Sequence, residues 1–265
     1  MVARILVGLA ASLSALVLAP ATGATPQTPA PCPGCWRPNV ATTWQWQLDG
    51  PIDYSVDAAV YDIDGLSHGT SAVARLHSAG RHVLCYVDVG SWESWRADAG
   101  RFPTGVLGRP NGWPGERWLD IRRLAVLAPI MRGRLDACRA AGFDAVEPDN
   151  VDGYANRSGF PLTAADQLRY DMWIANAAHR RGLGVALKND AGQVRALLPS
   201  FDFAVVEQCF EYSECSPYAP FVSAGKAVLE VEYRLSRSDF CPQARALGFS
   251  SLRKRLSLDA FRLPC

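Results

Sequence analysis

The chain has 265 residues, 27 Lys and Arg against 26 Asp and Glu, and a formal net charge of +1. This balance of charge argues against nucleic acid or an anionic membrane surface as the partner. The length suits one large α/β domain or two ordinary ones, and because no Gly/Ser-rich or charged linker divides the chain, we expect a single domain.

The first 24 residues have the composition of a secretory signal peptide. Arg4 supplies the positive charge, residues 5–18 the apolar segment, and residues 22–24 a small-residue cleavage site. An uncleaved membrane anchor is disfavoured because the apolar run is shorter than the ~20 residues that a membrane span needs. We therefore expect a secreted protein with no membrane association after cleavage, and a Pro-rich leader over residues 25–40.

Eight cysteines are distributed along the chain. Since a secreted protein folds in an oxidising compartment, they predict disulfides, although sequence alone does not fix the pairing. Local spacing favours three pairs: Cys209 with Cys215, Cys241 with Cys265, and Cys85 with Cys138. Cys32 and Cys35 resemble a redox motif, but no βαβ context surrounds them, which favours structural bridges. The four histidines are scattered and do not have the spacing of a zinc site.

Short apolar runs alternate with amphipathic stretches over residues 41–265. Eight runs predict strands, at residues 43–48, 58–62, 83–88, 145–149, 185–189, 203–207, 227–231 and 247–251. The clearest helical stretches are residues 70–79, 121–141, 163–181 and 238–246, and several end at glycine. This alternation predicts a single (β/α)8 TIM-type barrel with disulfides, and a doubly wound sheet is the main rival.

The predicted strand at residues 145–149 leads into the densest group of carboxylates in the chain. Glu147, Asp149 and Asp152 lie within six residues, and the strand at 203–207 ends in a further carboxylate, Glu207. Carboxylates packed so closely are costly unless they perform chemistry or bind a cation. Because barrel active sites lie at the carboxyl ends of the strands, Asp149 and Glu207 are candidates for an acid/base pair.

Side-chain alternation assigns the strand residues to the two faces of the sheet. Asp149 and Glu147 are expected inside the barrel with Val146 outside. On the strand at 83–88, Asp88 and Tyr86 are expected inside, which leaves Cys85 facing the helix that carries Cys138. On the strand at 227–231 the same rule points Glu230 and Glu232 inward, although a shift of one residue reverses that assignment.

Six motifs follow one another along the chain: Trp-Gln-Trp-Gln-Leu at 44–48, Cys-Tyr-Val-Asp-Val-Gly-Ser-Trp-Glu at 85–93, Gly-Glu-Arg-Trp-Leu-Asp-Ile-Arg at 115–122, Gly-Phe-Asp-Ala-Val-Glu-Pro-Asp-Asn-Val-Asp at 142–152, Leu-Lys-Asn at 187–189 and Val-Glu-Gln-Cys at 206–209. In order and spacing they resemble glycoside hydrolase family 114, the secreted endo-α-1,4-polygalactosaminidases. The resemblance covers essentially the whole mature chain. It implies a barrel that cleaves α-1,4-linked galactosamine or N-acetylgalactosamine polymers, with Asp149 and Glu207 as the catalytic pair.

Glycosidic cleavage needs one carboxyl group that protonates the leaving oxygen and a second that supports or attacks the anomeric carbon. By resemblance to other α-retaining barrels, Asp149 is the expected nucleophile and Glu207 the acid and then the base. Eight further residues are expected to bind substrate: Asp88, Asp152, Glu230 and Glu232 as an acidic groove, Lys188 as the counter-charge of Asp149, Tyr86 and Trp46 as stacking faces, and Gln47 at the end of the first strand. We expect a monomer that binds an amino-sugar polysaccharide and needs neither cofactor nor metal.

Two alternatives remain open at the level of sequence. A non-catalytic sugar-binding barrel would keep the aromatic and acidic rim but tolerate loss of one carboxylate of the pair. A metal-dependent hydrolase would use Asp149, Asn150 and Asp152 to hold a hard cation. A chelator would abolish activity in the metal-dependent case and leave a two-carboxylate glycosidase unaffected.

Overall fold

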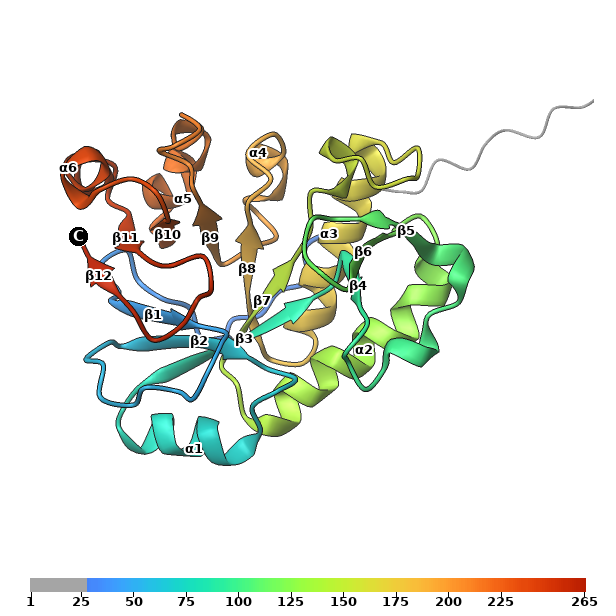
Figure 1. Cartoon of the computed structure of the whole chain (residues 1–265), viewed down its shortest axis with the longest axis horizontal. Helices are drawn as coiled ribbons and strands as arrows, with labels where there is room; N and C mark the ends of the chain where they lie inside the picture. Colours follow the sequence, from blue (N-terminus) through green and yellow to red (C-terminus); the bar gives the residue numbers. More distant parts are fainter. Residues whose placement is uncertain (1–27) are drawn as a thin grey trace, which may run out of the picture.

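The apolar runs form a curled sheet of nine strands (Figure 1), seen in a computed structural model that describes residues 28–265. Neighbouring strands follow chain order, and the first eight are parallel: β1 (Trp44–Gln47), β2 (Val60–Asp64), β3 (His82–Asp88), β7 (Ala145–Asp149), β8 (Gly184–Lys188), β9 (Phe203–Glu207), β10 (Val228–Glu232) and β11 (Ser250–Arg253). The short β12 (Leu263–Pro264) is antiparallel to β11. The predicted TIM-type architecture and its eight strands are confirmed, and the predicted signal peptide, residues 1–24, lies outside the described residues.

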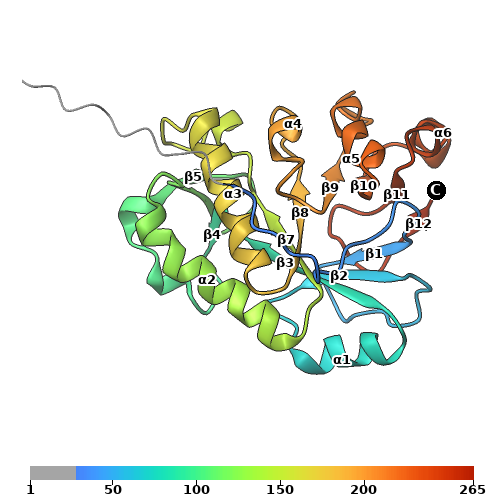
Figure 2. The ribbon, with the colours of Figure 1, turned by 180° about the vertical axis from the view of Figure 1, so that it is seen from behind.

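Helices cover the outside of the sheet. Figures 1 and 2 show α1, α2 and α3 along its first half and α4, α5 and α6 beside its second half. Their bounds are α1 (Thr70–Ser78), α2 (Leu124–Ala141), α3 (Ala164–His179), α4 (Val194–Leu197), α5 (Ala219–Ser223) and α6 (Arg237–Leu247), with short 3-10 turns η1 (Ala99–Arg101), η2 (Thr104–Val106), η3 (Gly153–Ala155) and η4 (Ser216–Tyr218). The expected repeat is incomplete, because residues 48–59 between β1 and β2 contain no helix.

The apolar residues separate into two buried layers. Val146 and Cys85 belong to the outer layer, between sheet and helices. Ala145 and Leu84 belong to the inner layer, which fills the barrel together with Trp44 and other side chains. The predicted alternation on β3 and β7 is therefore confirmed, and it places Glu147 and Asp149 on the inner face.

The orientation predicted for strand β10 is wrong. Leu229 and Val231 lie in the inner layer, and Glu230 pairs in register with Val206 of the outer layer. Glu230 and Glu232 therefore point toward the helices. Apolar residues lie on both faces of this strand, with Val228 in the outer layer, so the pattern alone does not fix the face of the two glutamates.

Four disulfides are present, and they include the three pairs favoured by spacing. Cys32 and Cys35 form the fourth, a bridge within the leader. The bond between Cys85 and Cys138 ties β3 to α2, as the alternation predicted. Among residues 28–265, no helix has both the length and the hydropathy needed to cross a membrane.

A small antiparallel sheet, absent from the sequence prediction, is inserted between β3 and α2. Its strands are β4 (Ser91–Glu93), β5 (Leu107–Pro110) and β6 (Glu116–Leu119), in the order β4-β6-β5. Gly90 lets this sheet meet the end of β7, since a Cβ there would lie 1.7 Å from the Asn150 carbonyl oxygen. The inserted sheet thereby forms one wall of the barrel mouth.

The C-terminal segment bridges the two ends of the sheet, β11 and β1. The Leu258 carbonyl accepts hydrogen bonds from the Leu48 and Asp49 amides at 3.0 and 3.3 Å. The Arg262 guanidinium donates to the Trp44 carbonyl at 2.7 Å, and the Trp44 indole donates to the Ser250 carbonyl at 2.8 Å. Chain and side-chain contacts thus complete the barrel around the inner layer.

Candidate active site

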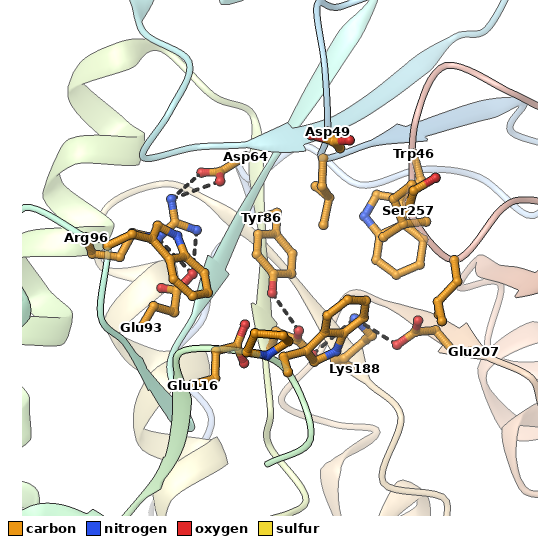
Figure 3. A pocket seen from close by; sticks show the side chains of 17 residues that line it. Trp46, Asp49, Asp64, Tyr86, Glu93, Arg96, Glu116, Lys188, Glu207 and Ser257 are labelled. Atoms are coloured by element: carbon orange, nitrogen blue, oxygen red, sulfur yellow. Dashed lines mark hydrogen bonds and ion pairs between the residues drawn. The ribbon is translucent and has the colours of Figure 1, made fainter. Parts of the chain in front are cut away.

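A pocket of about 430 Å3 opens at the carboxyl ends of the strands. Its walls include five residues that the sequence singled out, each from a different strand. They are Trp46 on β1, Tyr86 on β3, Asp149 on β7, Lys188 on β8 and Glu207 on β9. Figure 3 shows Lys188 and Tyr86 near the centre, Trp46 and Glu207 on one side, and Glu93 and Glu116 on the other. The structure therefore brings the proposed acid/base pair together.

Asp149 is held by donors on both of its carboxylate oxygens. The Tyr86 hydroxyl donates to Oδ2 at 2.7 Å, the Asn150 amide donates to Oδ1 at 2.8 Å, and the Lys188 ammonium lies 3.1 Å from Oδ1. Burial alone would raise the pKa of Asp149, but Lys188 and the hydrogen bonds hold it below its usual value. Asp149 is thus kept as a carboxylate, the form that a nucleophile requires.

Glu207 is the more exposed member of the pair, with 26% of its side chain accessible against 19% for Asp149. Its Oε1 accepts a hydrogen bond from the Tyr233 hydroxyl, and its Oε2 lies 3.3 Å from the Lys188 ammonium. The Asn189 side chain contacts Oε2 at 3.4 Å and accepts from the Glu207 amide at 2.9 Å. Glu207 is therefore fixed in position yet open to the pocket, as a group that exchanges protons with solvent must be.

The Lys188 ammonium forms ion pairs with three carboxylates. Its ammonium lies 2.7 Å from Glu147 Oε1, in addition to the contacts with Asp149 and Glu207. The side chain is 2% exposed, and burial would lower its pKa, yet the carboxylates raise the pKa well above the usual value. The Trp46 ring centroid lies 4.6 Å from the ammonium, so Lys188 is a fixed positive charge at the floor of the pocket.

Two acidic side chains lie below Lys188, inside the barrel. Asp62 and Glu147 are both fully buried. Burial, and then the Glu147 carboxylate, raises the pKa of Asp62 well above its usual value. Asp62 is therefore held toward its protonated form, and Glu147 is the carboxylate that contacts Lys188 from below.

The three strands that carry the central residues all end in the same way. Asn150, Asn189 and Gln208 directly follow Asp149, Lys188 and Glu207, and their φ angles are 60°, 48° and 55°. A positive φ is uncommon outside glycine and is best tolerated by residues such as asparagine. The backbone therefore turns sharply after each of these three strands, and the last residue of each strand points into the pocket.

The contacts of Lys188 limit the spacing of the proposed catalytic pair. Asp149 Oδ1 and Glu207 Oε2 lie 3.1 and 3.3 Å from the same nitrogen, so they are separated by no more than about 6.4 Å. Retaining glycosidases place their two carboxyl groups ~5–5.5 Å apart, and inverting enzymes leave roughly 6.5–9.5 Å for a water molecule. This limit on the two nearest oxygens is compatible with the retaining mechanism expected from the sequence.

Other predicted site residues lie away from the pocket walls. Gln47 faces outward, where its amide donates to the Pro51 carbonyl at 2.7 Å and stabilises the turn toward β2. Asp88 is fully buried beneath the inserted sheet and accepts from the Ser91 amide at 2.7 Å. Asp152 begins the turn η3. Glu230 lies under the helices, as does Glu232, whose Oε1 accepts from the Phe210 amide at 2.8 Å. None of the five lines the pocket.

Sequence reasoning missed part of the pocket, which comes from the inserted sheet and the C-terminal segment. The missed wall residues include Trp95, Arg96, Trp113, Glu116 and Leu256. The Gly-Glu-Arg-Trp-Leu motif contained Glu116, and the exposed Trp113 lies three residues before it, but the three short strands gave no periodic signal. The neighbouring Asp120 and Arg122 form an ion pair at 2.7 Å.

A group of acidic residues other than the one named for a metal comes together in the structure. Within residues 28–265, the acidic ligand atoms that lie within 4.8 Å of one another belong to Asp88, Glu93 and Glu116. Arg134 and Arg96 already contact Glu93, at 3.3 and 2.6 Å. Two guanidinium groups on one member make this group a poor match to a divalent cation.

Known proteins match this chain over its length. The model of glycoside-hydrolase family GH114 matches residues 25–265. The crystal structure of Aspergillus fumigatus Ega3 in complex with galactosamine has 38% sequence identity and a TM-score of 0.85, covering 90% of this chain and 100% of that chain. The glycoside hydrolase domain of PelA from Pseudomonas aeruginosa shares the fold at 12% identity and a TM-score of 0.64, covering 83% and 96%. A search of the curated proteins gave no match.

Proposed function

Since this chain belongs to glycoside-hydrolase family GH114, we propose that it hydrolyses α-1,4 linkages in galactosamine or N-acetylgalactosamine polymers with Asp149 and Glu207. The observation that carries the proposal is that Lys188 brings both carboxylates to one ammonium on the floor of one pocket. The galactosamine bound to the 38% identical Ega3 supports the substrate class.

In the first step, an oxygen of Asp149 bonds to the anomeric carbon while the glycosidic C–O bond breaks. Glu207 gives its proton to the leaving oxygen, which departs as a sugar hydroxyl. In the second step, the Glu207 carboxylate takes a proton from water, the water oxygen bonds to the anomeric carbon, and Asp149 is released. Two displacements restore the α configuration, so the reaction retains the anomer.

Lys188 and Tyr86 act on Asp149 throughout this cycle. Both stabilise its anionic form, by charge and by a 2.7 Å hydrogen bond, which keeps the nucleophile ionised between turnovers. Tyr233 donates to Glu207 and holds it toward the leaving group. These residues are positioning groups for the pair rather than participants in bond changes.

Trp46 lines the pocket and remains a proposed contact for the sugar ring. The residue is only 1% exposed, and its ring centroid lies 4.6 Å from the Lys188 ammonium. We therefore propose that Trp46 contacts the sugar only at its edge and chiefly holds Lys188 in position.

The four disulfides and the predicted signal peptide support a secreted enzyme. The substrate is then a polysaccharide outside the cell, and the enzyme acts on it as a monomer. No nucleic acid partner is included in this proposal.

Purified mature protein, incubated with poly-galactosamine and with its N-acetylated form, tests the function. We expect release of oligosaccharides by the wild type and loss of at least 100-fold in rate in Asp149→Asn and Glu207→Gln. Asp152→Asn is the matched control, because Asp152 lies near the strand end but outside the pocket. No release from either polymer by the wild type would refute the substrate, and undiminished release by both pair variants would refute the site.

A further inference from the structure

The pocket extends beyond the catalytic pair toward the inserted sheet. Figure 3 shows Glu116 and Glu93 across Tyr86 from Glu207, and Trp95 and Trp113 also line the pocket. The two tryptophans are 55% and 53% exposed. Large exposed aromatic side chains beside a glycosidase pocket offer stacking surfaces to a sugar ring.

Glu116 supplies a nearly buried carboxylate to the wall of the pocket. It begins β6 and is 8% exposed. The Asn111 side chain donates to its Oε2 at 2.6 Å, and the Ser91 hydroxyl lies 3.1 Å from the same oxygen. No donor from residues 28–265 reaches Oε1 of Glu116, so one oxygen of a nearly buried carboxylate remains available to a ligand.

The charges around Glu116 are not balanced by the protein. The two nearby guanidinium groups are already paired, Arg96 with Asp64 and Glu93, and Arg134 with Asp98 and Glu93. Within the described part of the chain, no Lys, Arg or His forms an ion pair with Glu116. A buried carboxylate without a counter-charge is costly, and a cationic group entering the pocket would remove that cost.

Asn111 connects the acidic and aromatic parts of this region. Its carbonyl oxygen accepts from the Trp113 amide at 3.0 Å, while its amide nitrogen donates to Glu116. One side chain therefore sets the positions of the stacking surface and of the carboxylate. The arrangement matches a ligand that carries a ring and a positive charge a few ångströms apart, which is the chemistry of a protonated amino sugar.

We propose that Glu116, walled by Trp95 and Trp113, forms a second subsite that binds the protonated amino group of the sugar next to the scissile linkage. An N-acetylated sugar carries no charge at that position, so the subsite selects free amines. This inference rests on the proposed function and adds the residue that sets its preference for deacetylated polymer.

The test compares wild type, Glu116→Gln and the control Glu214→Gln on oligogalactosamine and on its fully N-acetylated form. Glu214 is exposed and lies outside the pocket. We expect Glu116→Gln to raise KM for oligogalactosamine at least 10-fold with little change in kcat, and to leave the N-acetylated substrate unaffected. An equal loss on both substrates would mean that Glu116 only supports the fold, and would overturn the proposal.

A second variant and a chelator control separate the remaining outcomes. Asn111→Ala removes the support of Glu116 but keeps its charge, and it should raise KM for oligogalactosamine by a smaller factor, with the same selectivity. Loss of wild-type activity on EDTA treatment, with recovery on adding Ca2+, would assign the site to a metal ion and overturn the proposal. If the wild type cleaves neither substrate, the proposed function itself fails; if it cleaves both and Glu116→Gln changes no selectivity, only this inference fails.

Discussion

Lys188 and Glu147 form an ion pair of 2.7 Å inside the barrel, where their side chains are 2% and 0% exposed. The pair lies one layer below Asp149 and Glu207, the proposed catalytic carboxylates, and it fixes the ammonium that both of them contact. An ion pair so fully desolvated contributes little net stability, but removing one partner leaves an unpaired buried charge. The pair therefore has more to do with the geometry and charge of the site than with holding the fold together.

Replacing Lys188 by Met should leave Asp149 without its cation. The pKa of Asp149 then rises, since burial is no longer opposed by Lys188, and the acidic limb of the pH profile of kcat/KM moves to higher pH. We also expect a loss of ~3–5 kcal/mol in the free energy of unfolding. Urea unfolding and pH-rate profiles measure both effects. An unshifted acidic limb in a folded variant would contradict the role given to Lys188.

The Tyr86→Phe variant should show a smaller effect of the same kind. The Tyr86 hydroxyl donates to Asp149 at 2.7 Å, and a hydrogen bond to a charged group is worth ~1.5–3 kcal/mol. Losing it should raise the acidic limb of kcat/KM by about one pH unit, which corresponds to ~1.4 kcal/mol. Tyr61→Phe is the control, because the Tyr61 hydroxyl donates to backbone carbonyls outside the pocket. Equal profiles for the two variants would argue against a specific bond.

Asp62 gives a pH dependence of stability that the Asp62→Asn variant should lack. Burial raises the pKa of Asp62 in the folded protein and favours its protonated form, whereas the unfolded chain releases that proton near pH ~4. Unfolding is therefore favoured increasingly as the pH rises above ~4. We expect the variant to equal the wild type in urea at pH 4 and to exceed it at pH 7. A variant that is less stable than the wild type at pH 7 would show that Asp62 is needed as a charge.

The disulfide between Cys85 and Cys138 spans 53 residues and ties β3 to α2. Replacing both cysteines by Ala should lower the free energy of unfolding by ~2–5 kcal/mol, because the bridge restricts a long loop of the unfolded chain. The bridge between Cys32 and Cys35 spans 3 residues, and its double Ala variant should lose clearly less. Thermal or urea unfolding compares the two, and equal losses would contradict the loop-length argument.

Much of the site was predictable because its residues end strong apolar runs. Asp149 and Glu207 each follow four residues of a buried strand, and alternation then assigned Glu147 and Cys85 to their faces. Gln47 was misplaced although the evidence was present, since its alternating neighbours Trp44 and Trp46 already filled the inner face.

Other features required information that local patterns do not carry. Strand β10 has apolar residues on both faces, Val228 on one and Leu229 and Val231 on the other, so alternation alone could not assign Glu230 and Glu232. The inserted strands β4 to β6 are three or four residues long, too short for a clear period, and their pairing depends on contacts distant in sequence. The place of Glu116 and Trp113 in the pocket could therefore be recognised only from the tertiary structure.

The central claim is that Asp149 attacks the anomeric carbon and Glu207 serves as acid and then base. The configuration of the first-formed product tests it most directly, and proton NMR of a digestion of oligogalactosamine records that configuration before mutarotation. We predict that the new reducing end appears first as the α anomer. First appearance of the β anomer would mean direct attack by water, and would contradict a covalent role for Asp149.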